Sequence, residues 1–215
     1  MQTKAGKIGY GTLLVFAVLF PLISLVRYLF LDPTMLVEAG FKMYDFHDSL
    51  WTTVLYTHIT TAAAAFFIGP FNFMKSSYTK NIKRHRMLGK VYFAAIVVSS
   101  LCGFYLAVYA HGGLLAKAGF FMLSVLWLYT TVKAVNLARQ KKIQDHRQWM
   151  VRSYAVTFAA LTFRVWLSAL AMFGNFDLAY GLAAWLCWAV NLIVVEVWLW
   201  RNNSRKPLIQ AKNAL

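Results

Sequence analysis

Six long apolar segments run through this chain of 215 residues, and short connectors separate them. The segments cover residues of about 8–30, 51–74, 88–110, 114–135, 150–173 and 178–200. A helix needs about 20 apolar residues to cross the hydrocarbon core of a bilayer, so each segment is long enough. We therefore predict an all-α integral membrane protein, a six-transmembrane-helix bundle in which residues 1–215 form a single membrane domain.

Composition supports this class, because the chain is 60% hydrophobic and only 13% charged. Soluble domains are nearer a quarter charged. The net charge of +15 lies in clusters between the apolar segments and not along one soluble face, so we predict no nucleic-acid binding. Cys102 and Cys187 both fall inside apolar segments, which disfavours a disulfide or a CxxC motif.

The basic residues are distributed unevenly between the two sides of the membrane. The N-terminus, residues 75–90, residues 133–152 and the tail from Arg201 hold eighteen of the 22 Lys and Arg residues. The other side holds Arg27, Lys42 and Lys117. By the positive-inside rule both termini are cytoplasmic, and the basic clusters of a multi-pass cytoplasmic (inner) membrane protein face anionic phospholipids. We expect residues 31–50 to form an outer loop, with a short amphipathic helix.

The two basic connectors resemble each other. Residues 83–86 (KRHR) precede one apolar segment and residues 144–147 (QDHR) precede another, with Tyr92 and Tyr154 about two turns further on. One interpretation is a parallel duplication of a two-helix hairpin. Chance similarity between two basic connectors is the other.

Polar side chains at membrane depth are costly, so each one is a candidate functional residue. His58 lies within the second segment, where it either serves a bound molecule or hydrogen-bonds a neighbouring helix. Arg164 lies near the middle of the fifth segment, and Tyr154 and Thr157 share its polar stripe as candidate substrate-binding residues. Arg164 requires a quinone, a haem propionate, an anionic lipid or substrate, or the ring of His58. Snorkelling towards backbone carbonyls is the alternative.

The remaining histidines suggest haem b as a cofactor, because helical bundles hold haem between histidines on facing helices. His58 with His111 would serve an outer haem, and His85 with His146 an inner one, with Arg164 available for a propionate. His85 and His146 can equally be ordinary residues of basic connectors. We predict no metal site, since the sequence lacks HxxH and HExxH spacing.

A group of motifs between residues 50 and 170 is distinctive. It comprises His58, Gly69-Pro70-Phe71-Asn72-Phe73, His85-Arg86 with Gly89 and Tyr92, and His146-Arg147 with Trp149, Met150, Arg152, Ser153, Tyr154, Thr157 and Arg164. With these residues the chain resembles the bacterial membrane-protein family catalogued as domain of unknown function 2306. The resemblance implies a multi-pass protein of the cytoplasmic membrane and brings no assigned reaction.

Three functions remain open from the sequence. The first is a redox protein that binds haem or is linked to quinone. The second is a small transporter or a protein that handles lipids or anions, which at this size calls for a homodimer. The third is a structural accessory protein without chemistry. The sequence contains no GxGxxG, P-loop or GxSxG motif, so it assigns no soluble-enzyme reaction.

Overall fold

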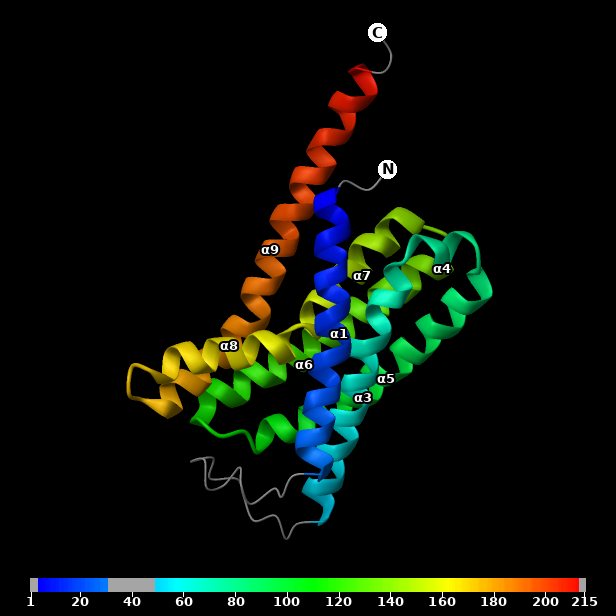
Figure 1. The fold of residues 1–215 in the computed structure, drawn as a ribbon. Helices are drawn as coiled ribbons and strands as arrows, with labels where there is room; N and C mark the ends of the chain where they lie inside the picture. Colours follow the sequence, from blue (N-terminus) through cyan, green and yellow to red (C-terminus); the bar gives the residue numbers. More distant parts are fainter. Residues whose placement is uncertain (1–3, 31–48, 213–215) are drawn as a thin grey trace.

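The computed structural model describes residues 4–30 and 49–212, and within these ranges it contains helices and no strand (Figure 1). The helices are α1 (Lys4–Phe30), α3 (Ser49–Phe73), α4 (Lys75–Thr79), α5 (Ile82–Val108), α6 (Gly113–Arg139), α7 (Ile143–Thr157), α8 (Ala159–Ala171) and α9 (Phe176–Lys212). The prediction of an all-α protein is confirmed. The outer loop expected at residues 31–50 falls almost wholly outside the described residues.

Four helices are long and apolar enough to cross a membrane. They contain the stretches Leu50–Phe73, Ile82–Val108, Gly113–Arg139 and Phe176–Asn203. The pair α7 and α8 passes the same test together, which makes up to five spans if the bent pair crosses as one. In α1 the described apolar stretch, Leu14–Ser24, is shorter. The chain is thus a multi-pass helical membrane protein, while a sixth crossing by α1 stays a prediction.

The helices pack mainly as neighbours in the chain. α3 packs on α5, α5 on α6, α6 on α7 and α8 on α9, and α9 closes the bundle by packing on α6. α1 packs against α3, where the rings of Phe20 and Phe66 lie with centroids 5.1 Å apart. Figure 1 shows both termini at the same end of the molecule, together with α4 and the α6–α7 turn.

The helices extend further into the basic connectors than the hydropathy pattern predicted. α5 begins at Ile82 and not near residue 88, because the side chain of Asn81 accepts a hydrogen bond from the backbone N–H of Arg84 at 3.0 Å. This is an N-cap, which satisfies one of the free amides of the first turn. α6 likewise continues to Arg139 and α9 to Lys212. Much of the basic charge therefore lies on helix ends and not in loops.

Residues 150–173, predicted as one helix, form two helices in the structure. The segment is divided at Phe158 into α7 and α8, which are bent by 41°. The sequence there holds neither Pro nor Gly, and the support for the bend comes from α9. The amide of Asn191 donates to the carbonyl of Ala155 at 3.0 Å and to the hydroxyl of Thr162 at 3.1 Å. Backbone groups freed in a membrane helix need such partners.

Candidate functional site

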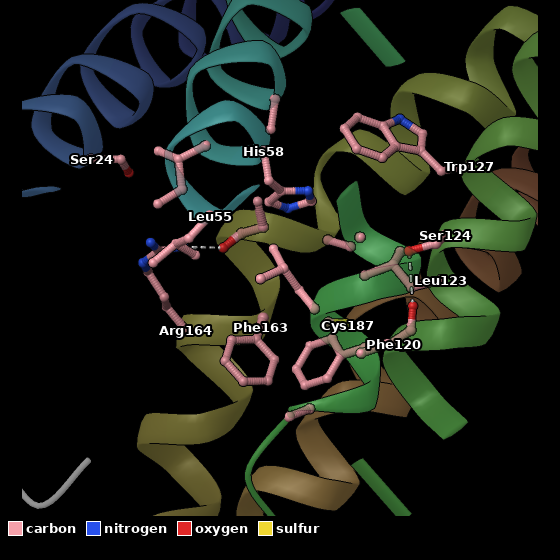
Figure 2. Close-up of a pocket in the computed structure, with 18 of the residues that line it drawn as sticks. Ser24, Leu55, His58, Phe120, Leu123, Ser124, Trp127, Phe163, Arg164 and Cys187 are labelled. Carbon is pink, nitrogen blue, oxygen red and sulfur yellow. Dashed lines mark hydrogen bonds between the residues drawn. The ribbon is translucent and has the colours of Figure 1, made fainter. Parts of the chain in front are cut away.

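A cavity of about 780 Å³ lies inside the bundle, within the size range of small-molecule sites. The bend between α7 and α8 accounts for its position, because α8 contributes one of its walls and α3 the opposite one. The α8 face consists of residues at helical spacing: Ala159, Ala160, Phe163, Arg164, Leu167 and Ser168. The α3 face is similarly spaced: Trp51, Leu55, His58, Ile59, Ala62, Ala63 and Phe66. Figure 2 shows ten of the lining side chains with labels.

His58 reaches the cavity with one ring nitrogen already engaged. Its Nδ1 lies 2.8 Å from the backbone carbonyl of Ser99 on α5, and the Ser99 hydroxyl donates to the backbone carbonyl of His58 at 3.1 Å. A carbonyl can only accept, so Nδ1 carries the hydrogen in this contact. The neutral ring therefore leaves Nε2 as an acceptor. The sequence alternative of a helix-to-helix hydrogen bond is present, and it is compatible with a ligand at Nε2.

Arg164 lines the cavity from α8 and is also exposed, so the cavity is open beside it. Its guanidinium donates to the carbonyl of Ala160 at 2.6 Å and lies 4.9 Å from the ring centroid of Phe20 on α1. The carbonyl contact is the one that the snorkelling alternative expects. Arginine stays charged under all ordinary conditions, so the wall of this apolar cavity carries a permanent positive charge.

The remaining lining is aromatic, aliphatic or small, and among the described lining residues there is no carboxylate. Phe120, Phe163 and Tyr180 form an aromatic group, with ring centroids 5.2 to 5.7 Å apart. Gly103 lies at a close approach, since an added Cβ would meet the Ser124 hydroxyl at 2.6 Å. Aromatic walls together with the Arg164 guanidinium favour a planar molecule that carries hydrogen-bond acceptors over a hydrated cation.

His111 lines the edge of the same cavity, but its Nε2 lies 2.6 Å from a carboxylate oxygen of Asp177. The pair joins the α5–α6 turn to the first turn of α9. His58 and His111, the two residues that the haem hypothesis pairs, thus both line this cavity. The two rings differ in availability, because the Nε2 of His111 faces Asp177 while the Nε2 of His58 is left for a ligand.

Thr157 lines the cavity but takes part in a buried hydrogen-bond network. Its hydroxyl accepts from the indole N–H of Trp127 at 2.9 Å and bonds with the Tyr92 hydroxyl at 3.1 Å. Tyr92 also bonds with Ser153, which bonds with Thr131 at 2.8 Å. The sequence reasoning did not identify Trp127, Thr131 or Ser99, because each acts through a partner distant in the chain.

Three predicted site residues do not line the cavity. The Tyr154 hydroxyl donates to the carbonyl of Phe66 at 2.9 Å, so it joins α7 to α3. His85 and His146 lie at the end of the bundle that carries α4, where His85 is within electrostatic range of His146. The Nδ1 of His146 donates to the carbonyl of Ala134 at 2.9 Å.

The fold and the site together define a class: a multi-pass helical membrane protein with a ligand-sized cavity inside its bundle. Residues 55–199 match the model of the family described as "Predicted membrane protein (DUF2306)", and the chain belongs to this family. The match confirms the resemblance seen in the sequence and extends it through most of α9. No curated protein and no solved structure matches the chain.

Proposed function

We propose that the cavity binds a lipid-soluble small molecule with a planar head group that carries hydrogen-bonding oxygen atoms, and that a quinone is the class that fits. The observation that carries this proposal is the presence of His58 and Arg164 in the walls of one aromatic cavity. Arg164 can donate to a quinone carbonyl, and the Nε2 of His58 can accept from the hydroxyl of the reduced form. The opening beside Arg164 lets such a molecule enter from the bilayer.

Haem binding is the second candidate, because a histidine whose Nδ1 donates to a carbonyl presents Nε2 as a metal ligand. In this arrangement His58 would hold the iron and Arg164 would pair with a propionate. The His58–His111 pair is a weaker basis for it, since Asp177 engages the Nε2 of His111. The absorption spectrum of the protein purified from haem-supplied cells tests this candidate directly, because a bound haem gives a Soret band that is lost in His58→Leu.

The quinone proposal is tested by titrating the protein in nanodiscs with decylubiquinone. Binding is followed by quenching of tryptophan fluorescence, since Trp51 and Trp127 line the cavity. We expect His58→Leu and Arg164→Leu each to weaken binding about tenfold, as expected for one lost hydrogen bond to a polar or charged group. Decanol, which has the chain length without the ring, should compete poorly.

The matched controls are His146→Leu and Arg139→Leu, which remove a histidine and an arginine that do not line the cavity. Both should bind the quinone within about twofold of the unaltered protein, a difference well below the value of one hydrogen bond. Equal affinity of all five proteins would overturn the proposal. Equal competition by decanol would reduce the site to an unspecific apolar pocket and would overturn it as well.

If neither quinone nor haem binds, we propose two alternatives: transport of a solute, and an accessory role without chemistry. A transporter would lose solute uptake in Arg164→Leu at normal protein abundance. An accessory protein would show only altered stability in that variant. The homodimer that transport calls for is tested by the mass of the protein in nanodiscs.

For the arrangement in the membrane we propose six crossings, with α1 as the first and the bent pair α7–α8 as the fifth. The protein then lies in the cytoplasmic membrane with both termini in the cytoplasm, and the basic helix ends face anionic headgroups. The distribution of Lys and Arg supports this orientation. The two termini at one end of the bundle support an even number of crossings.

A further inference from the structure

A second group of polar side chains lies at the end of the bundle that carries both termini. We name it the inner cluster and define it as Tyr78 of α4, His85 of α5, and His146 and Arg147 of α7. The guanidinium of Arg147 lies 4.8 Å from the ring centroid of Tyr78, and the ring of His85 meets Tyr78 edge-on at 6.2 Å. Three separate helices thus bring the Arg147 guanidinium and the His85 imidazole against the ring of Tyr78, and His146 lies within electrostatic range of His85.

Buried polar atoms beside the inner cluster lack protein partners. Among the described residues, none donates to or accepts from the Nδ1 of His85, the hydroxyl of Ser77 or the side-chain amide of Asn72. Ser77 is 8% exposed and Asn72 6% exposed, and both precede Tyr78 on the α3–α4 segment. Buried polar groups are nearly always satisfied by protein or by an ordered bound species, so these atoms call for a partner other than the described residues.

The positive charge around the inner cluster favours the binding of an anion. Lys83, Arg84 and Arg86 lie in the first turns of α5, and Arg147 lies in the first turns of α7. The N-termini of both helices add partial positive charge. His85 lies within electrostatic range of Arg86, Arg147 and His146. Asp145 is the carboxylate in the first turn of α7, and it is exposed to solvent.

We propose that the inner cluster binds a phosphate group, carried either by a phospholipid headgroup or by a soluble phosphate. Arg147 supplies paired N–H donors, which match phosphate oxygens. The Nδ1 of His85 and the hydroxyl of Ser77 supply further donors, at atoms that have no hydrogen-bond partner among the described residues. The site is separate from the central cavity, so it stands whether or not a quinone binds there.

The test is native mass spectrometry of the protein in mixed micelles with phosphatidylglycerol, and with diacylglycerol of the same chains as the phosphate-free control. We expect retention of phosphatidylglycerol over diacylglycerol and a loss of about tenfold in Arg147→Gln. Ser77→Ala should also weaken retention while keeping the protein folded, because this hydroxyl has no partner to lose among the described residues. Arg139→Gln, at the same end of the bundle, is the control of equal charge.

A second arm adds inorganic phosphate as a competitor and identifies the source. Displacement of the lipid in the unaltered protein, and no displacement in Arg147→Gln, shows that a soluble phosphate occupies the site. Retention despite phosphate shows that the site takes a lipid headgroup. The proposal is overturned if phosphatidylglycerol and diacylglycerol are retained equally. It is also overturned if Arg139→Gln and Arg147→Gln weaken retention by the same factor, since bulk charge then explains the effect.

Discussion

At the scale of single residues, Gly69 sets how closely α3 and α7 approach. A Cβ at this position would overlap the ring of Tyr154, whose hydroxyl bonds to Phe66 one turn away. We predict that Gly69→Ala lowers the free energy of unfolding by about 1–3 kcal/mol, the usual effect of overpacking. Gly89→Ala is the matched control, because nothing lies within 4 Å of the Cβ that this substitution adds. Thermal unfolding in detergent compares the two, and equal midpoints would contradict the close approach.

Tyr92 offers a second prediction at this scale. Its hydroxyl bonds with Ser153 and Thr157 inside the bundle. Hydrogen bonds within membrane proteins contribute about 0.6 kcal/mol on average and up to about 1.7 kcal/mol, so Tyr92→Phe should destabilise the protein by an amount in this range. Tyr129→Phe, at an exposed tyrosine, should leave the midpoint unchanged. A Tyr92→Phe protein as stable as Tyr129→Phe would show that the network contributes nothing to stability.

At the scale of elements, the bend at Phe158 depends on α9. Asn191→Leu removes both hydrogen bonds from the Asn191 amide to this region. We predict a loss of about 0.6–1.7 kcal/mol and a movement of α8 relative to α3, measured as a changed distance distribution between spin labels at Val165 and Thr53. Asn136→Leu, at an exposed position on α6, is the control. An unchanged distribution in Asn191→Leu would mean that another contact holds the bend.

The bend also shows what the sequence can and cannot predict for this protein. Hydropathy located the membrane helices because lipid imposes length and apolarity on each one separately. It placed His58 and Arg164 at membrane depth for the same reason, and the structure brings both to one cavity. The bend was not predictable, because Ala155 and Asn191 are 36 residues apart. The tautomer of His58 was not predictable either, because the carbonyl that determines it belongs to Ser99, 41 residues away in the chain. The Asn81 cap was missed because hydropathy alone set the predicted start of this helix, although Asn is a typical N-cap residue.

At the scale of the whole molecule, polar contacts are arranged in levels along the bundle. The His111–Asp177 pair joins two turns at one end, the cavity with His58 and Arg164 lies between, and the inner cluster lies at the end with the termini. Large apolar side chains are exposed on the helix surfaces between these ends, as contact with lipid requires. In the proposed arrangement we therefore expect the cavity to meet the bilayer interior and the inner cluster to meet the headgroups.

The proposed six-crossing arrangement predicts on which side of the membrane each connection between helices lies. Reporter fusions after Ser77, after Gln144 and at the C-terminus should all report the cytoplasm, whereas fusions after Gly113 and Gly174 should report the opposite side. The physical reason is the charge asymmetry, because this arrangement places eighteen of the 22 Lys and Arg residues on the cytoplasmic side of the membrane. A green fluorescent protein fused to the N-terminus tests α1 separately. If it fluoresces in the cytoplasm, α1 crosses the membrane. If its fluorescence is lost while the other fusions behave as expected, the bundle has five crossings and the N-terminus lies outside.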